Sequence, residues 1–432
     1  MAEALAGSAP DPVALHRANP DAWPFLLHTA SPGARSTCSL LLFADPATPP
    51  ITGGADRLAE LEAAWQRERR AQPDDEVFAG GWFVYLGYET AAAIEPTLSL
   101  PRPSPDLPDV HAQRCRGALV LDHAGNRARL VGETPEVVAE MRSLLADKPP
   151  ADPSARPPEL AIEVDDGTRF EDGVRRIREY ILAGDVFQVN LSRGWRARAV
   201  ERLDPVALYR RLAEANPAPF AGLARLPGGS LLSSSPERLV ASRDGRVDTR
   251  PIAGTRPRGT SPGQDRALSD ELIAHPKERA EHVMLIDLER NDLGRVCVPG
   301  SVRVDELMVI ESYAHVHHIV SNVTGRLAPD ASPVDVIRAV FPGGTITGCP
   351  KIRCMEIIAE LEQVGRGAYT GSMGYLGLDG RLDLNILIRS MWVTGPEVHF
   401  RTGAGIVADS IPSAELAETE AKARGLLRAL EP

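Results

Sequence analysis

The stretch FAGLARLPGGSLLSSSPERLVASRDGRVDTRPIAG, residues 220–254, alternates apolar and polar side chains and is interrupted by glycine-rich turns. A period of two residues is typical of strands with one face in a core, and glycines between such runs favour hairpins. The stretch therefore predicts an antiparallel meander. A second strand series is expected over residues 368–407, with Asp379 and Gly380 as a hairpin turn. Helices are also expected, but not in regular alternation with single strands, so the predicted fold class is α+β.

Amphipathic helices should pack against these strands. Residues 169–185, RFEDGVRRIREYILAGD, place Val174, Ile177, Ile181 and Leu182 on one face, which predicts a helix that directs this face towards a core. Near the C-terminus, residues 410–430 predict another helix, with Ser413 as its N-cap.

The composition excludes several classes of function. The chain has 432 residues, 43% hydrophobic and 25% charged, which predicts a folded protein too long for one ordinary core. A net charge of -11 argues against nucleic acid and anionic membrane surfaces as partners. No apolar run approaches the ~18 residues of a membrane span. The five cysteines form no CxxC pair. We therefore expect a soluble, cytoplasmic protein that has no membrane partner.

A proline-rich segment divides the chain unequally. Residues 148–158 read KPPADPSARPP, which has no apolar periodicity and is typical of an extended linker. We predict an N-terminal domain over residues 1–147, a linker over 148–164, and a larger C-terminal domain over 165–432.

Two segments carry paired glutamates at helical spacing. HPKERAEHVMLIDLERNDLG, residues 275–294, contains Glu278 and Glu281, and Glu415 and Glu418 repeat that spacing near the C-terminus. Residues three apart share one face of a helix. Two such pairs could meet at a hard divalent cation such as Mg²⁺, which prefers oxygen ligands. Alternatively, both pairs are solvated helix faces.

Two glycine turns could receive an anion. FPGGTITGCPKIRCMEIIAELE, residues 341–362, runs from a turn into a helix that begins near Lys351. Free N–H groups, the helix dipole and the ammonium there favour a carboxylate or phosphate. RTGAGIVADS, residues 401–410, could also bring backbone N–H groups close to a ligand. Either stretch could equally be an ordinary turn.

Taken together, the motifs are more specific than any one of them. Along the chain they are GDVFQVNLS, SSSPERLV, RPIAGTRPRG, KERAEHVMLIDLERNDLGRV, VHHIVSN, GGTITGCPKIRCMEIIAELE, LNILIRS and GAGIVADS. In this order the sequence resembles the chorismate-utilising enzymes over essentially its whole length, with the catalytic motifs after Arg169. The resemblance implies a large two-lobed β-sandwich body flanked by helices, of the anthranilate synthase component I type.

The resemblance also implies roles for the polar residues. Glu278, Glu281, Glu415 and Glu418 are similar to the family's Mg²⁺-binding glutamates, and the ion would hold the ring carboxylate of chorismate. Tyr369 and Arg389 match the positions that hold the enolpyruvyl carboxylate. The remaining positions expected to contact the substrate are Gly254, Thr255, Thr345, Lys351, Gly403, Ala404, Gly405 and Lys422.

Two further positions match catalytic groups of the family. Glu237, in SSSPERL, matches the acid that protonates the departing C4 hydroxyl, and at neutral pH it would need a pKa raised by burial. His318 matches a pocket histidine that the resemblance links to pyruvate elimination. Without the resemblance, a buried capping glutamate and a core histidine would be the simpler interpretations.

The nucleophile is predicted from two residues. Gln188 takes the place where isochorismate and salicylate synthases carry a lysine that activates water, so we expect ammonia, supplied by a separate glutamine amidotransferase subunit. Ala253, in PIAGT, is similar to anthranilate synthases, whereas aminodeoxychorismate synthases resemble one another in having lysine there. FQVNLS, NPAPF, TGCPKIRCMEII and LNILIRS resemble aminodeoxychorismate synthase. We predict component I of that type, which makes 4-amino-4-deoxychorismate, with anthranilate as the alternative product.

Overall fold

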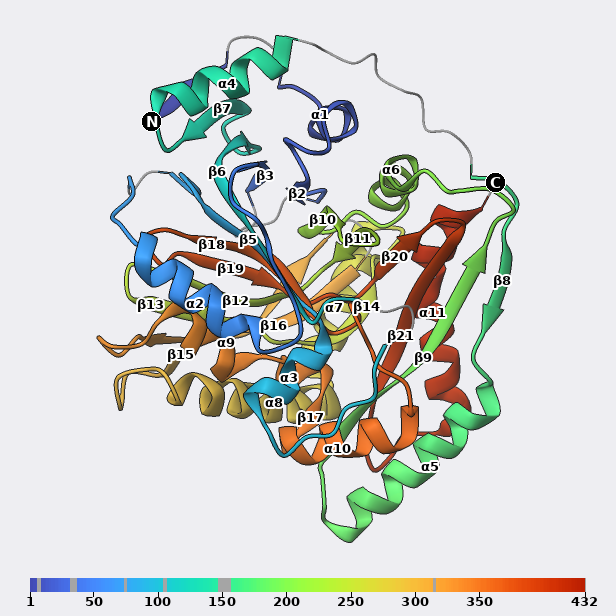
Figure 1. The fold of residues 1–432 in the computed structure, drawn as a ribbon. Helices are drawn as coiled ribbons and strands as arrows, with labels where there is room; N and C mark the ends of the chain where they lie inside the picture. The colour runs from blue at the N-terminus through green and yellow to red at the C-terminus, as the bar shows by residue number, and fades with distance from the viewer. Residues whose placement is uncertain are drawn as a thin grey trace.

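The computed structural model describes residues 1–5, 9–31, 37–73, 76–103, 107–146, 157–313 and 316–431. In these residues, antiparallel strands form one connected network with helices packed around it, which confirms the α+β prediction (Figure 1). The pairings follow two paths through the network.

The first path builds one layer of the sandwich. Its strands are β1 (Ala2–Ala4), β7 (Arg127–Gly132), β6 (Val110–Asp122), β3 (Cys38–Ala44), β2 (Phe25–His28), β10 (Phe220–Leu226), β11 (Gly229–Ser235), β20 (Ser390–Thr394), β21 (Glu397–Ile406) and β9 (Gln188–Arg198), each paired with the next. β8 (Ala161–Val164) and β17 (Gly348–Cys349) also pair with β9. The predicted meander supplies β10 and β11 at the middle of this layer.

The second path builds the other layer. Its strands are β4 (Ile51–Gly53), the first half of β6, β5 (Gly81–Leu86), β18 (Ser372–Gly377), β19 (Leu382–Asn385), β12 (Arg238–Arg243), β13 (Arg246–Thr249) and β16 (Val316–Arg326). β14 (Ile252–Pro257) and β15 (Arg303–Ser312) also pair with β16. Because β6 pairs with β3 and β7 in one half and with β4 and β5 in the other, it joins the two layers.

The core between the layers follows from strand alternation. On β2, Phe25 points to the inner face, where its ring stacks on Phe83 of β5 with centroids 3.8 Å apart, while its neighbour Leu26 belongs to a separate cluster on the outer face. Trp392 of β20 and Met373 of β18 lie in the same inner cluster as Phe25. Side chains from both layers thus form one apolar interior, as expected for a sandwich.

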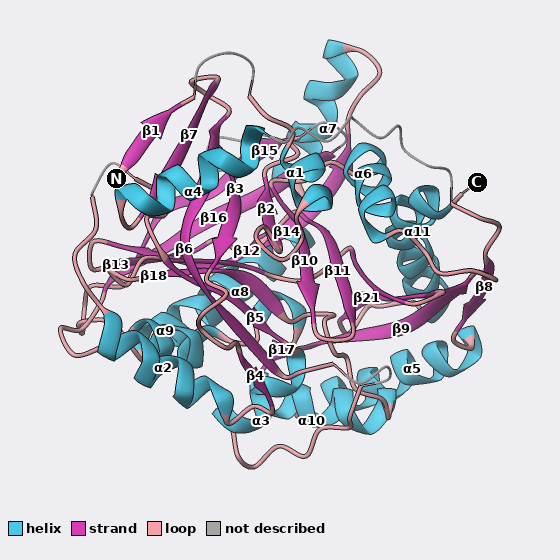
Figure 2. Cartoon of the chain, turned by 45° about the horizontal axis from the view of Figure 1, so that its top comes forward, coloured by secondary structure: helices cyan, strands magenta, loops and turns pink. Residues whose placement is uncertain are grey.

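Helices cover the outer faces. In Figure 2 the strands occupy the middle, with α2 (Arg57–Glu68) and α9 (Pro333–Val340) on one side and α6 (Pro205–Ala215) and α11 (Pro412–Leu430) on the other. The remaining helices are α1 (Pro12–Ala18), α3 (Ala91–Ile94), α4 (Pro135–Ala146), α5 (Gly167–Ala183), α7 (Pro262–Ala274), α8 (Pro276–Gly294), α10 (Lys351–Glu362), and the short η1 (Tyr88–Thr90) and η2 (Gly344–Ile346).

The predicted domain boundary remains a prediction. Of the predicted linker, residues 148–156 lie outside the described residues, and β8 occupies residues 161–164. Strands from the two sides of this stretch pair directly: β2 with β10, and β5 with β18. The two predicted domains therefore share both layers of the sandwich.

Two local predictions were wrong. Leu182 is 80% exposed, although Val174 and Ile177 on the same helix are buried as expected. The helix after residue 410 begins at Pro412 with Ile411 as N-cap, so Ser413 lies inside its first turn and does not cap it. No helix in the described part of the chain is long and apolar enough to cross a membrane.

Candidate active site

Glu237 lies in the connection between β11 and β12, where its carboxyl group accepts two hydrogen bonds. Its side chain is buried, and Thr345 Oγ1 of η2 donates to its Oε1 at 2.9 Å. Burial raises the pKa of Glu237 to about 7, against the opposing effects of the hydrogen bonds from Thr345 and the Ile252 backbone and of the positive charge of Arg389. A carboxyl group with this pKa can hold a proton at neutral pH and give it up.

His318 of β16 forms a second part of the site. Its Nδ1 lies 2.9 Å from Thr255 Oγ1 on the neighbouring β14, and its buried Nε2 has no hydrogen-bond partner in the described residues. Burial, together with the charge of Arg389, lowers the pKa of His318 to about 4. The ring is therefore neutral near pH 7 and can offer one nitrogen to a ligand.

Gly254 brings β14 close to a predicted metal ligand. Its φ is +65°, a left-handed conformation that favours glycine. A Cβ at this position would lie 2.8 Å from Glu278 Oε2, so the glycine lets the glutamate approach the strand. Glu278 Oε1 also accepts a hydrogen bond from Arg256 at 3.2 Å, which partly neutralises its charge.

Arg389 is a partly buried arginine of the site region. It precedes β20, its backbone is left-handed with φ 52°, and its guanidinium makes no hydrogen bond or ion pair with any described residue. Burial lowers its pKa, while the charge of Glu237 opposes that shift. Its charge also acts on the pKa of Glu237 and of His318, so the three predicted residues lie within electrostatic range of one another. A partly buried cation with no protein anion can hold an anionic ligand.

Tyr369 and Gln188 meet the glycine turn of β21. A Cβ on Gly403 would lie 2.7 Å from the Tyr369 hydroxyl, and one on Gly405 would lie 2.4 Å from Gln188 Nε2. Glycines at both positions therefore allow these side chains to approach the strand. Burial raises the pKa of Tyr369 to about 12, so its hydroxyl stays a donor.

Lys422 of α11 lies at the same turn. Its Nζ donates to the Gly403 carbonyl at 2.9 Å and forms an ion pair with Glu418 at 2.7 Å. The neighbouring Ala404 is fully buried in the core beneath the turn. The structure thus gathers these predicted residues around β21.

Lys351 is placed differently from the predicted anion contact. Its Nζ forms a 2.6 Å ion pair with Asp292 of α8 and donates to the Val340 carbonyl at 3.2 Å. Pro350 is the N-cap of α10, and Lys351 is its first residue. The ammonium is therefore committed to the protein, and a role in substrate binding remains a prediction.

An acidic pair that the sequence did not single out lies next to this lysine. Glu289 and Asp292 of α8 are buried. Burial and the neighbouring Asp292 raise the pKa of Glu289 to about 8, against the charge of Lys351. The signal was present in LERNDL, where the two acids are spaced like the predicted metal ligands and are flanked by Leu288 and Leu293.

The four predicted metal ligands lie on two helices, Glu278 and Glu281 on α8 and Glu415 and Glu418 on α11. In the described residues, no group of three or more His, Cys, Asp or Glu side chains is close enough to hold a metal ion. Glu278 and Glu418 each contact a cationic side chain. The four carboxylates are therefore not gathered around one point in the described structure, and a Mg²⁺ site between them remains a prediction.

Ala253 lies on β14 opposite Ile319 and is 8% exposed. The register of β14 shifts between Ala253 and Thr255, next to Gly254. A methyl group at this position provides neither a nucleophile nor a base, so residue 253 itself contributes no reacting group.

Known proteins match most of this chain in sequence and in fold. Residues 30–428 match the family described as chorismate binding enzyme. The anthranilate synthase component I-like protein of Synechocystis sp. is 47% identical over 363 residues, which are 83% of this chain and 74% of that protein. Aminodeoxychorismate synthase component 1 of Bacillus subtilis is 44% identical over 368 residues, 82% of this chain and 77% of that protein. The structure of anthranilate synthase component I from Streptococcus pneumoniae TIGR4 matches with a TM-score of 0.81 at 30% identity, covering 91% of this chain and 93% of that one.

Proposed function

Since the chain belongs to the chorismate-binding enzymes, we propose that it aminates chorismate with ammonia to 4-amino-4-deoxychorismate and water. Arg389 carries this proposal, because a partly buried guanidinium without a protein anion suits a substrate with two carboxylates. Arg389 would bind the enolpyruvyl carboxylate of chorismate, and the Tyr369 hydroxyl would donate to that carboxylate. Glu237 would protonate the departing C4 hydroxyl. A pKa of about 7 for Glu237 supports that role.

We propose that Mg²⁺ is the cofactor, with Glu278 and Glu281 of α8 on one side and Glu415 and Glu418 of α11 on the other. When bound, the ion would neutralise the ring carboxylate. Omission of Mg²⁺ should abolish turnover. The variants Glu278→Gln and Glu418→Gln should each need a higher Mg²⁺ concentration for half-maximal turnover. Full turnover in EDTA would contradict this assignment.

Ammonia is proposed to come from a separate glutamine amidotransferase subunit in the cytoplasm. All five cysteines are free thiols, which fits a reducing compartment. Purified chain should therefore turn over chorismate with ammonium, but with glutamine only when that subunit is added. Turnover with glutamine by the purified chain would exclude this dependence.

Ala253 changes the first step expected for the reaction. Without a lysine, no covalent intermediate can form at that position, so we propose that ammonia or a small nucleophile beside Ala253 performs the first addition to the ring. An Ala253→Lys variant should then keep or raise turnover if the pocket retains the geometry of a covalent route. Loss of the fold in that variant is checked by thermal unfolding.

Ala253 also favours a second candidate, the formation of anthranilate with release of pyruvate. The two products are distinguished in one assay with purified chain, chorismate, Mg²⁺ and ammonium. The proposed reaction gives 4-amino-4-deoxychorismate without pyruvate, detected by mass. Fluorescent anthranilate and equimolar pyruvate as the only products would overturn the first proposal and support the second.

A further inference from the structure

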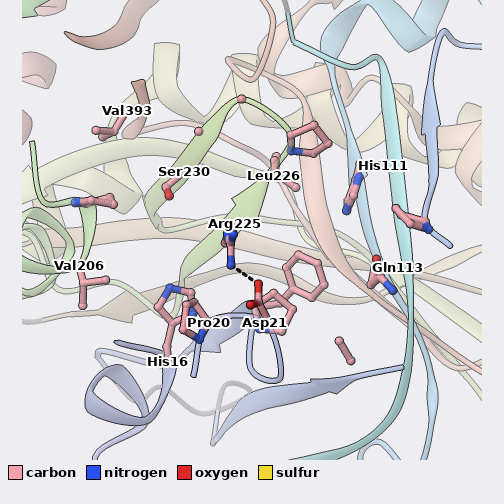
Figure 3. A pocket seen from close by; sticks show the side chains of 18 of the residues that line it. His16, Pro20, Asp21, His111, Gln113, Val206, Arg225, Leu226, Ser230 and Val393 are labelled. Carbon is pink, nitrogen blue, oxygen red and sulfur yellow. Dashed lines mark hydrogen bonds and ion pairs between the residues drawn. The ribbon is translucent and has the colours of Figure 1, made fainter. Parts of the chain in front are cut away.

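A cavity of about 950 Å³ lies apart from the candidate active site, and none of its lining residues belongs to that site (Figure 3). It is bordered by α1, β6 and the hairpin between β10 and β11. Phe25 and several prolines form much of its wall, including Pro20, Pro24, Pro205 and Pro227. Its volume falls within the range of small-molecule sites, and rigid apolar walls suit a flat ring system.

His111 of β6 is a polar group without a protein partner in this cavity. It is 4% exposed, and its Nδ1 has no hydrogen-bond partner in the described residues. Burial lowers its pKa to about 4, so the ring is neutral near pH 7 and offers one donor and one acceptor. Leaving such a group unpaired costs about 1–3 kcal/mol, and a ligand with a hydroxyl or ring N–H would recover it.

Two further groups extend this polar lining. Ser230 of β11 is 9% exposed, and its hydroxyl has no partner within the described residues. Gln113 shares the β6 face of His111 and points its Nε2 at the Asp45 and Thr48 carbonyls, at 3.3 and 3.2 Å. Its amide oxygen is left as an acceptor. All three residues lie on strands, which hold them in place.

A cation lies between these groups. Figure 3 shows Arg225 with Ser230 on one side and His111 and Gln113 on the other. Arg225 Nη1 forms a 2.5 Å ion pair with Asp21, whose side chain is 87% exposed. Exposed pairs contribute little stability. Asp21 can therefore be displaced by another carboxylate, which the planar guanidinium would bind bidentately.

We propose that this cavity binds a planar aromatic or heteroaromatic carboxylate about two fused rings in size. Its ring lies against Phe25 and the prolines, its carboxylate replaces Asp21 on Arg225, and a ring hydroxyl or N–H contacts His111. The ligand would contact β11 near its start, and the same strand leads to Glu237 at its end. The proposal does not depend on which product the candidate active site makes.

The test is a fluorescence titration of the full chain with 6-hydroxy-2-naphthoate, and with 6-hydroxy-2-naphthamide as the uncharged control. The naphthoate should bind with a Kd below about 1 mM. Arg225→Met should weaken its binding at least tenfold, whereas Asp21→Asn should tighten it about threefold, because the competing carboxylate is gone. Binding of the amide should change less than twofold in both variants.

Two more variants separate this cavity from other anion sites. Arg389→Met should leave the Kd of the naphthoate unchanged, and Ser230→Ala should weaken binding about threefold. If Arg225→Met fails to fold, the opposite directions expected for Asp21→Asn and Ser230→Ala still test the assignment. Absence of naphthoate binding, loss of binding in Arg389→Met, or weaker binding in Asp21→Asn overturns the proposal.

Discussion

Arg366 and Arg389 are two arginines of the C-terminal half, one buried and one partly buried, with opposite surroundings. Arg366 forms a bidentate pair with Glu362, at 2.7 and 3.1 Å, and donates to the Asn190 carbonyl at 2.7 Å. Arg401 also pairs with Glu362, at 3.0 Å. We call Glu362, Arg366 and Arg401 the Arg366 cluster. Arg389 has no such partner in the described chain.

The comparison shows how a structural cation differs from one available to a ligand. Burial alone would raise the pKa of Glu362, yet Arg366 and Arg401 overcome this effect and lower it. The Arg366 cluster is thus electrically satisfied and fixes β9, β21 and α10 relative to one another. Around Arg389, the nearby acid has a raised pKa and the nearby histidine a lowered one. Groups with such shifted pKa values are typical of functional sites.

The largest expected effect is on turnover in Glu237→Gln. Because glutamine cannot donate a proton, we expect kcat for chorismate consumption to fall about a thousandfold with the thermal unfolding midpoint preserved. Glu360→Gln is the control, since that carboxylate only accepts a hydrogen bond from the exposed Tyr180 hydroxyl. A loss of less than tenfold in Glu237→Gln would remove the acid from the mechanism.

Arg366→Met should act on stability instead. It leaves Glu362 buried with only Arg401 as a cationic partner, so we expect the free energy of unfolding to fall by about 3 kcal/mol in a urea titration. Arg353→Met, which removes exposed 2.9 Å pairs with Asp185 and Glu356, should cost less than about 1 kcal/mol. Equal losses in the two variants would erase the contrast between buried and exposed pairs.

The pH dependence of stability should reveal Glu237. Its pKa of about 7 lies above the ordinary value of 4.5, so the unfolded chain ionises first as the pH rises. The wild type should therefore lose stability relative to Glu237→Gln between about pH 4.5 and 7, by about 3 kcal/mol in total. Above pH 7 the difference should be constant. Urea titrations of both proteins measure this difference, and a flat curve over the whole range contradicts the raised pKa.

Arg389→Met gives the smallest effect and the sharpest test of the comparison. We expect KM for chorismate to rise about a hundredfold, because a charge-assisted contact to the substrate is lost. Stability should stay equal or increase, since the guanidinium has no protein partner to lose. Destabilisation as large as in Arg366→Met would place Arg389 among the structural arginines.

Local patterns in the sequence predicted much of this fold. The alternation over residues 220–254 predicted strands that became β10 to β14, and Asp379–Gly380 predicted the turn between β18 and β19. The pairing of β5 with β18 could not be predicted this way, because strand partners distant in sequence are chosen by tertiary packing. Leu182 failed for a related reason: it falls at the end of the apolar face, where α5 leaves the core.

Sequence motifs identified some residues of the candidate site, but they could not predict contacts that depend on the fold. Motif order singled out Glu237, His318, Tyr369 and Arg389. The glycines at 403 and 405 lie against the side chains of Tyr369 and Gln188, and the predicted approach of a ligand to that turn stays a prediction. The motifs could not show that Lys351 is bound to Asp292, because that pair joins α10 to α8 through the fold. Spacing alone also could not distinguish Glu289, which faces inward, from the more exposed carboxylates of the same helix.

The ladder between β5 and β18 has a consequence for how the chain assembles. Residues 1–146 and 157–432, made as two separate polypeptides, would each carry an open strand edge that matches the other. Mixed together they should reconstitute one body. Alone, each fragment should recruit a second copy of itself or precipitate, and two intact chains at high concentration could exchange their N-terminal halves into a swapped dimer.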